Sequence, residues 1–315
     1  MTIDFREIGQ QVQHAYQRIS SVVLKTPLEP VSDFSGYRGQ LFFKMENLQH
    51  TGSFKLRGAS NKILSLTAEQ ASQGVIAASN GNHGIGVAAA AGRQGIPAEV
   101  YVSSHVSPVK AKRIEEYGAS IRRAGANPLE AELAARAAAV QTGKVFISPY
   151  NDYEVIAGQG TIAVELQQQR PAVDAIFVAV GGGGLIAGIG AYQKLVSPKT
   201  EIIGCWPHNS RVLYESLKAG RILDFPEQPT LSESTAGGLE PESVTLDICR
   251  QVIDRSVLVT EDEIASAVRQ VHQTRGWIIE GAAGVALAAF LKQADFYHAR
   301  TVVVVICGGN TGSKL

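Results

Sequence analysis

Apolar residues recur at two spacings along the chain, and each spacing predicts one type of element. Phe5, Ile8, Val12, Tyr16 and Ile19 recur every three or four residues, which predicts an amphipathic helix at the start. Later come short apolar runs, each typical of a buried strand, and most are followed by a helical stretch. The expected strands are 41–45, 75–79, 98–102, 175–180, 202–205 and 301–307, with helices after 79, from about 108, at 185–195 and at 211–219. This alternation predicts an α/β fold with parallel sheets covered by helices on both faces.

No internal repeat and no low-complexity linker marks a domain boundary in the sequence. Residues 72–147 form a self-contained run of strand–helix units, so we expect a small inserted domain there. Residues 1–71 and 148–315 would then form a large domain. In open sheets of this kind, ligands bind beyond the carboxyl ends of the strands, so the loops that follow strands are the places to look for a site.

The composition excludes several classes of partner. Among 315 residues, 45% are hydrophobic, which is enough for a sizeable core, and 29 basic residues balance 29 acidic ones. A neutral chain without a run of one charge does not favour nucleic-acid or membrane partners, and no apolar stretch is long enough for a membrane span. Charges at Asp4 and Arg6 stand where a signal peptide would be apolar. Together with three widely spaced cysteines, this leads us to expect a cytoplasmic protein.

The first unusual loop is 51–58, Thr-Gly-Ser-Phe-Lys-Leu-Arg-Gly. A lysine is by default a solvated surface residue, but Lys55 directly follows Phe54 and stands three residues before Gly58. An amine held in an apolar site has a lowered pKa, which suits Schiff-base chemistry, and an aromatic ring can pack against a flat cofactor. Lys55 is therefore a candidate catalytic residue.

Two further loops are rich in glycine. Residues 79–84, Ser-Asn-Gly-Asn-His-Gly, follow an apolar strand and resemble an anion site at a helix start, although an ordinary capped turn accounts for them equally well. Residues 181–184 are four consecutive glycines between a strand and a helix. Such a run costs backbone entropy without packing, and a phosphate held by main-chain N–H groups is the natural reason for it.

A competing interpretation is a nucleotide site. Residues 182–187 match the loose G-x-G-x-x-A pattern of dinucleotide-binding proteins. The acidic residue about 20 positions later is Glu201, which begins the next strand instead of ending it, where a ribose would be reached. A nicotinamide-dependent oxidoreductase therefore stays a distant alternative.

Five segments occur together and in order: 53–58, 79–84, 157–161 (Ala-Gly-Gln-Gly-Thr), 181–184 and 307–310 (Cys-Gly-Gly-Asn). In this combination the chain, from Pro27 to Asn310, resembles the fold-type II pyridoxal-phosphate enzymes, which share the fold of the tryptophan synthase β chain. Within them it is most similar to the serine/threonine dehydratase and serine racemase branch. The resemblance implies two lobes of α/β structure, pyridoxal 5'-phosphate in the cleft between them, and a homodimer.

The resemblance also implies roles around the cofactor. Lys55 would form the Schiff base and act as base on the substrate's α-proton. Phe54 would pack beside the ring, and Asn82 would bond its 3′-oxygen. Glu280 stands where relatives place a carboxylate near the cofactor, with a buried salt-bridge partner as the alternative. The other expected contacts are Gly181, Gly182, Gly183, Gly184 and Leu185 around the phosphate, and Cys307 at the pyridine nitrogen, where relatives usually carry Ser or Thr.

Substrate residues implied by the resemblance lie mainly in the second loop. Ser79, Asn80, Gly81 and His83 would surround the substrate carboxylate, and Tyr150 stands where the pocket of the family varies. Racemases of this branch carry a serine at the position of Asn80, as acid and base on the face opposite the lysine. An amide cannot exchange protons usefully near neutral pH, so the sequence favours elimination over racemisation.

Two departures concern regulation. Racemase-like relatives place acidic metal ligands after the strand that ends at Cys205, whereas residues 206–212 here are Trp-Pro-His-Asn-Ser-Arg-Val. Divalent cations such as Mg²⁺ and Ca²⁺ prefer oxygen ligands, so we expect no metal there. The sequence given ends soon after Asn310, without the regulatory domain of biosynthetic threonine dehydratases. We expect a catabolic enzyme.

The sequence thus predicts a pyridoxal-phosphate-dependent ammonia-lyase. It would eliminate water from a β-hydroxy α-amino acid such as L-threonine or L-serine and yield a 2-oxo acid and ammonia. An amino-acid racemase, and a dehydratase for a bulkier β-hydroxy amino acid of the kind met in hydroxyectoine breakdown, remain as alternatives.

Overall fold

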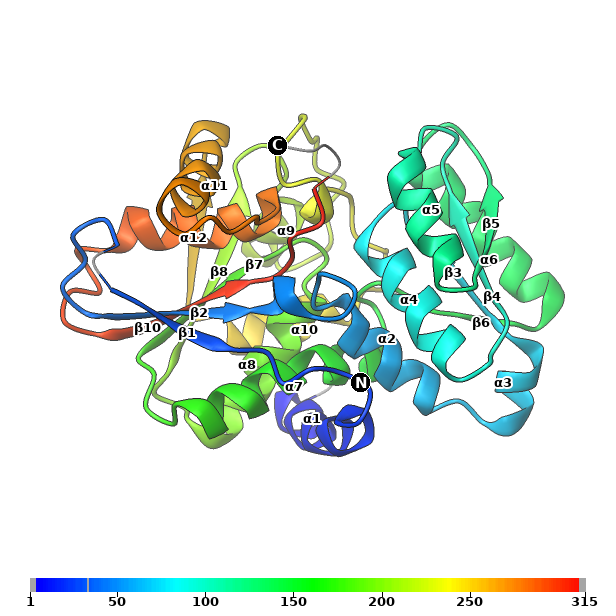
Figure 1. Cartoon of the computed structure of the whole chain (residues 1–315), viewed down its shortest axis with the longest axis horizontal. Coiled ribbons are helices and arrows are strands. Elements are labelled where there is room, and N and C mark those ends of the chain that lie inside the picture. The colour runs from blue at the N-terminus through cyan, green and yellow to red at the C-terminus, as the bar shows by residue number, and fades with distance from the viewer. Residues whose placement is uncertain (1–3, 33, 312–315) are drawn as a thin grey trace.

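A computed structural model describes residues 4–32 and 34–311, and it has two lobes of α/β structure (Figure 1). The larger lobe contains a six-stranded sheet in the order β1-β2-β10-β7-β8-β9, and the smaller lobe contains a four-stranded sheet in the order β5-β4-β3-β6. The strands are β1 (Leu28–Val31), β2 (Gln40–Met45), β3 (Val75–Ala78), β4 (Ala98–Val102), β5 (Ser120–Arg123), β6 (Val145–Phe146), β7 (Ala175–Ala179), β8 (Glu201–Pro207), β9 (Arg255–Val259) and β10 (Thr301–Ile306).

The predicted fold class is confirmed. Every strand pair in the small sheet is parallel, and in the large sheet only the edge strand β1 runs antiparallel, against β2. The helices are α1 (Phe5–Ile19), α2 (Lys55–Leu64), α3 (Ala68–Gln73), α4 (Asn82–Arg93), α5 (Pro108–Glu116), α6 (Pro128–Thr142), α7 (Tyr153–Gln169), α8 (Gly184–Val196), α9 (Val212–Ala219), α10 (Thr245–Val252), α11 (Glu261–Arg275) and α12 (Gly281–Gln293), with short 3-10 turns η1 (Glu46–Leu48) and η2 (Glu233–Thr235).

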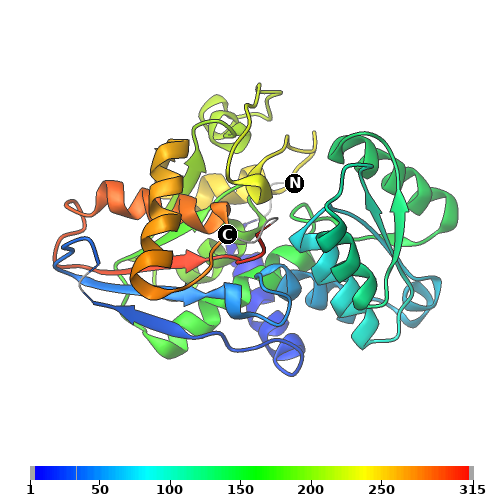
Figure 2. The same cartoon turned by 45° about the horizontal axis from the view of Figure 1, so that its top comes forward.

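Helices cover both faces of the large sheet. Helices α11 and α12 lie on one face, and α1, α7 and α8 lie on the other (Figures 1 and 2). Because both faces are covered, the central strands are buried along their whole length, and β7 carries no exposed residue. Within the described residues, no helix combines the length and the apolar character needed to cross a membrane.

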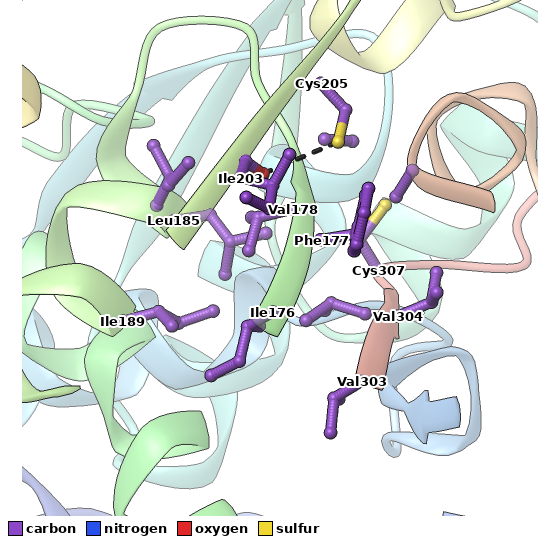
Figure 3. Packing of buried hydrophobic residues seen from close by; sticks show 14 of the residues in the cluster. Ile176, Phe177, Val178, Leu185, Ile189, Ile203, Cys205, Val303, Val304 and Cys307 are labelled. Carbon is purple, nitrogen blue, oxygen red and sulfur yellow. Dashed lines mark hydrogen bonds between the residues drawn. The ribbon is translucent and has the colours of Figure 1, made fainter. Parts of the chain in front are cut away.

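The main hydrophobic core lies between β7, β8 and β10 and the helices that cover them. Figure 3 shows Ile176, Phe177 and Val178 of β7 packed among side chains of neighbouring elements. The ring of Phe177 meets Phe290 and Tyr297 edge-on, with centroids 5.7 and 5.3 Å apart. Leu185 and Cys307, two of the expected cofactor contacts, belong to the same cluster, so the carboxyl ends of these strands are held by a fully packed core.

Helix α2 lies where the two lobes meet. Its residues Leu56, Ala59 and Ile63 join the hydrophobic cluster of the small sheet, although they precede the range 72–147. The same helix packs on α4 of the small lobe and on α7 of the large lobe. The division at 72–147 stays a prediction, and α2 contributes packing to both of the units that it would separate.

All six expected strands are present, with ends shifted by one or two residues, and so is the helix at the start of the chain. Strands β1, β5, β6 and β9 were not expected. Strand β6 has only two residues, and β5 includes Arg122 and Arg123, so neither gives an apolar run. Edge strands of this kind carry little hydrophobic signal because much of their surface faces water.

Candidate active site

Several helices begin close together where the two lobes meet, in the region that we call the cleft. Helix α2 begins at Lys55, α4 at Asn82 and α8 at Gly184, and Glu280 directly precedes α12. Helix α4 approaches α2 so closely that a Cβ at Gly86 would lie 3.1 Å from the carbonyl carbon of Lys55. Helix starts carry unpaired N–H groups and partial positive charge, so this arrangement favours anionic ligands.

The amine of Lys55 lies inside this cleft. Its Nζ donates a hydrogen bond to the carbonyl oxygen of Pro149 at 2.8 Å and lies 5.1 Å from the ring centroid of Phe54. Burial lowers the pKa of Lys55 to about 8, although the nearby Cys307 and Glu280 act in the opposite direction. The shift increases the fraction of this amine that is unprotonated near neutral pH, which is the form that acts as a nucleophile or a base.

Asn82 and Glu280 are bonded to each other across the cleft. The Asn82 amide nitrogen donates to the two Glu280 carboxylate oxygens at 3.1 and 2.8 Å, and its oxygen accepts from Asn310 at 2.7 Å. Among the described residues, Glu280 bonds the Asn82 amide and forms no salt bridge with a cation. Burial raises the pKa of Glu280, and the Asn82 hydrogen bond offsets part of that rise.

Cys307 follows β10 and lies beside Glu280. Its Sγ is 3.9 Å from Glu280 Oε1, and its carbonyl oxygen accepts a hydrogen bond from the N–H of Phe54 at 3.0 Å. Burial, reinforced by the Glu280 carboxylate, raises the pKa of this thiol well above its usual value, so it stays neutral. The segment after β10 thereby joins the start of α2 to the start of α12.

The four glycines after β7 have no room for side chains. A Cβ at Gly181 would lie 2.7 Å from the Thr235 carbonyl oxygen, and a Cβ at Gly182 would lie 2.4 Å from the Tyr150 ring. Gly183 has φ +88°, a conformation that favours glycine. Within the described residues, the N–H groups of 181–183 donate to no acceptor of the protein. They therefore remain available to an anion.

The loop 79–84 is held by its own side chains. Asn80 exchanges two hydrogen bonds with Ser103, from its Nδ2 to Ser103 Oγ at 2.7 Å and from the Ser103 N–H to its Oδ1 at 2.8 Å. Ser79 Oγ accepts from the Gly81 N–H at 3.0 Å. The amide of Asn80 is therefore occupied on both its nitrogen and its oxygen.

His83 is buried and neutral. Its Nε2 lies 2.8 Å from the Ile147 carbonyl oxygen, which can only accept, so Nε2 carries the hydrogen. Nδ1 is then an acceptor, and it has no partner in the described residues. Burial, together with the nearby Lys55, lowers the pKa of His83 to about 3. An acceptor of this kind repels a carboxylate and suits a hydroxyl or an ammonium group.

A side-chain network that the sequence did not reveal closes one end of the cleft. Tyr150 packs on the glycine loop, and its hydroxyl accepts a hydrogen bond from the Glu240 N–H at 2.9 Å. The Glu240 carboxylate pairs with Arg136 of α6 at 2.8 Å and with the Asn151 amide at 2.9 Å. Glu240 and Arg136 stand in no recognisable motif, and their separation of 104 positions leaves no local signal.

The segment 206–212, which starts within β8, carries aromatic and basic groups where metal ligands were considered. Trp206 is buried against Gly204 and Tyr214, and Arg211 pairs with Glu215 at 2.9 Å. Within residues 4–32 and 34–311, no group of three or more acidic, histidine or cysteine side chains is arranged to hold a metal ion. The expectation that no cation binds there stays a prediction.

Comparison with known proteins decides the family. The model of the family described as "Pyridoxal-phosphate dependent enzyme" matches residues 19–308. The chain belongs to this family. The dinucleotide interpretation of the glycine loop is thereby set aside, and the recognised motifs 53–58 and 181–184 lie within the matched range.

Relatives of this pyridoxal-phosphate enzyme carry two kinds of name. An L-threonine ammonia-lyase of Thermotoga maritima is 38% identical over 96% of this chain and 75% of its own length. A serine racemase of Arabidopsis thaliana is 34% identical over 95% of this chain and 92% of its own length. Among solved structures, the processed form of threonine deaminase isoform 2 from Solanum lycopersicum superposes with a TM-score of 0.93 at 31% identity, covering 98% of this chain and 91% of the other.

The residues of the cleft fit pyridoxal phosphate. The phosphate is an anion, and the glycine loop offers unpaired N–H groups at the start of α8. The aldehyde needs an unprotonated amine, which Lys55 provides because its pKa is lowered to about 8. A neutral thiol at Cys307 is compatible with an unprotonated pyridine nitrogen.

Proposed function

We propose that this enzyme is an ammonia-lyase that removes water from L-threonine or L-serine. Elimination takes the α-hydrogen and the β-hydroxyl, and the resulting enamine tautomerises and is hydrolysed by water to a 2-oxo acid and ammonia. The observation that supports this most directly is the buried Lys55 amine, held by the Pro149 carbonyl at 2.8 Å and with its pKa lowered to about 8. The names of the threonine ammonia-lyase and threonine deaminase relatives support the substrate class.

The proposal assigns the cofactor to the groups of the cleft. Lys55 is the lysine that the cofactor joins, 181–184 with Leu185 hold its phosphate, and Phe54 and Asn82 lie at its ring. When bound, pyridoxal phosphate supplies a conjugated ring that draws electrons from the bonds of the substrate's α-carbon. In this proposal, Glu280 and Cys307 set the charge around that ring.

Proton movement falls to this chain's own side chains. The unprotonated Lys55 amine accepts the α-hydrogen, and the Pro149 carbonyl orients its lone pair. The loop 79–84, at the start of α4, receives the substrate carboxylate. The ring of His83 has a bare acceptor at Nδ1 and therefore receives a hydroxyl or ammonium hydrogen instead. Tyr150 limits the length of the pocket beside the glycine loop.

Asn80 separates the lyase from the racemase alternative. Racemisation needs a proton donor on the face opposite Lys55, and the amide of Asn80 has no usable pKa. Its donor and its acceptor are both engaged by Ser103. We therefore rank elimination first, although a serine racemase stands among the relatives. A homodimer in the cytoplasm belongs to the same proposal, and the mass of the protein in solution tests the dimer.

The test of this function is Lys55→Ala beside Lys62→Ala. Both lysines lie on α2, but Lys62 is partly buried and paired with Asp152 at 2.6 Å. We expect Lys55→Ala to lose the visible absorption of the lysine-bound cofactor and at least about a thousandfold of kcat, since the base and the attachment point are both removed. Lys62→Ala should keep both. Turnover of threonine or serine by Lys55→Ala at the wild-type rate would refute the proposal.

A further inference from the structure

A second polar cluster lies fully buried on the other side of α2. It consists of two cations and two carboxylates, which we call the ion-pair cluster: Lys44, Glu46, Arg57 and Glu165. Lys44 is on β2, Glu46 begins η1, and Glu165 is on α7. All four side chains are 0% or 1% exposed, and none of them belongs to the proposed chemistry.

Arg57 is the centre of this cluster. Its guanidinium forms a bidentate ion pair with Glu46, in which Nε donates at 2.7 Å and Nη2 donates at 2.8 Å. It forms a second bidentate pair with Glu165, in which Nη1 donates at 2.7 Å and Nη2 donates at 3.0 Å. Burial alone would lower the pKa of Arg57, but the two carboxylates raise it, so the side chain stays charged. Bidentate pairs of this kind fix the orientation of the guanidinium as well as its position.

Lys44 completes the charge balance. Its Nζ bonds Glu165 at 2.5 Å, the Thr26 carbonyl oxygen at 2.8 Å and the Gln169 amide oxygen at 3.0 Å. Its three N–H groups are therefore all used. With two positive and two negative groups, the cluster is neutral as a whole.

Besides Arg57, the start of α2 is held by Gln159, whose amide oxygen accepts a hydrogen bond from the Gly58 N–H at 3.1 Å. The residue before α2, Phe54, provides no side-chain cap, unlike the Asp152 that caps α7. Arg57 stands in the first turn, two residues after Lys55, and its N–H donates to the Phe54 carbonyl oxygen at 3.0 Å. The orientation of this turn determines where the Lys55 amine lies.

The backbone of Lys55 and Arg57 is closely packed on both sides, so a shift of Arg57 would also move Lys55. On one side, a Cβ at Gly158 of α7 would lie 2.7 Å from the Arg57 carbonyl oxygen. On the other side, a Cβ at Gly86 of α4 would lie 3.1 Å from the Lys55 carbonyl carbon. The carbonyl that accepts from the amine belongs to Pro149, which leads into α7, the helix that carries Glu165.

We propose that Arg57 is a positioning residue. Its bidentate pairs with Glu46 and Glu165 fix the first turn of α2. The fixed turn holds the Lys55 amine against the Pro149 carbonyl. The inference rests on the proposed function, because it gives Arg57 a role in catalysis only through Lys55. A merely structural cluster would support stability without affecting turnover in the folded enzyme.

Two charge-balanced double variants separate these roles. Arg57→Met with Glu46→Gln removes one cation and one anion and keeps the pair of Lys44 with Glu165. Lys44→Met with Glu165→Gln removes the same number of charges and keeps the grip of Arg57 on Glu46. Replacing a buried ion pair by uncharged groups of similar volume is often neutral for stability, so both proteins should fold.

The measurements are the unfolding temperature, kcat and KM as separate values, and the dissociation constant of pyridoxal phosphate by equilibrium dialysis. We expect the Arg57→Met/Glu46→Gln enzyme to lose about 100-fold in kcat well below its unfolding temperature, since a shift of about 1 Å has that effect. Its cofactor binding should weaken and its KM should change less than kcat. The Lys44→Met/Glu165→Gln enzyme keeps the bidentate pair of Arg57 with Glu46 but loses the pair with Glu165, so it should lose much less kcat than the Arg57→Met/Glu46→Gln enzyme.

Equal losses of kcat in the two double variants, or no loss in either, would overturn the positioning role. If the Arg57→Met/Glu46→Gln protein does not fold, the Arg57→Lys variant is measured instead, because lysine keeps the positive charge but cannot form bidentate pairs. Its control is Phe177→Leu in the core of Figure 3, which lowers stability far from α2. A fall in kcat only in Arg57→Lys supports the role, and equal kcat in both variants contradicts it.

Failure of the inference is distinguishable from failure of the proposed function. If Lys55→Ala is inactive while the Arg57 variants turn over normally, only the positioning role is wrong. If Lys55→Ala keeps its activity, the proposed function is wrong, whatever the Arg57 variants show.

Discussion

Helix α2 has a polar cluster on each side, and the two clusters satisfy their polar groups to different extents. In the ion-pair cluster, every N–H of Lys44 has an acceptor and Arg57 grips two carboxylates. In the cleft, the Lys55 amine has the single carbonyl of Pro149, and His83 Nδ1 has no partner. Both regions are buried and titratable, but only in the ion-pair cluster do two cations pair directly with two carboxylates. We infer that fully satisfied hydrogen bonds make the ion-pair cluster rigid. In the cleft, groups with few or no hydrogen-bond partners remain reactive.

The largest effect on stability should come from unbalancing the saturated cluster. Arg57→Ala leaves two buried carboxylates facing the single cation Lys44. We expect a loss of about 3–5 kcal/mol in the free energy of unfolding, because an uncompensated buried charge remains. Denaturant unfolding measures this loss. Arg122→Ala, which removes an exposed partner of Glu99, should change stability little. Similar effects of the two substitutions would mean that the buried cluster is solvated and not a fixed anchor.

On the cleft side, the glycine loop should bind cofactor only while its N–H groups are accessible. Gly183→Val adds a side chain at φ +88°, where it would also meet Leu213. We expect most of the pyridoxal phosphate to be lost on dialysis, as followed by visible absorbance. Gly143→Val is the matched control, because Gly143 has φ +71° and open space around it. Equal cofactor retention in both variants would show that the loop serves packing and not the phosphate.

The sequence predicted the reactive groups of the cleft and the central strands of the large sheet. Lys55 and the glycine run stand in short motifs, and strands such as β7 and β10 have apolar runs that predict them. The Pro149 carbonyl gives no signal, because any residue carries one. The two arms of Arg57 reach residues 11 and 108 positions away, and such pairings appear only once the chain is folded. Sequence motifs therefore revealed the reactive groups and left the groups that hold them unseen.

The lowered pKa of Lys55 predicts how turnover depends on pH. Protonation removes the lone pair that accepts the α-hydrogen, so kcat should rise with pH through a midpoint of about 8. The groups that face the amine are Cys307, Glu280 and His83, and the last is neutral in this range. Glu280→Gln removes a charge that raises this pKa, so the midpoint should shift to lower pH, whereas the exposed Glu263→Gln should leave it unchanged. A midpoint that stays fixed in Glu280→Gln contradicts this assignment.

A smaller effect is expected from replacing Asn80 in the loop 79–84. Asn80→Ser places a hydroxyl on the face opposite Lys55 and removes the exchange of hydrogen bonds with Ser103. The ratio of racemisation to elimination should rise, even if the total rate falls. Chiral chromatography of the remaining amino acid, with the 2-oxo acid measured in parallel, gives this ratio. Abundant D-amino acid from the wild type would move the racemase alternative to first place.

The central claim is that Lys55 is the lysine to which the cofactor is attached. Borohydride reduction of the cofactor-loaded enzyme fixes that attachment, and digestion followed by mass spectrometry identifies the labelled residue. The account predicts the phosphopyridoxyl group on the peptide that contains Phe54 and Lys55, and on no other lysine in stoichiometric amount. A label on Lys44, Lys62 or any other lysine would contradict it.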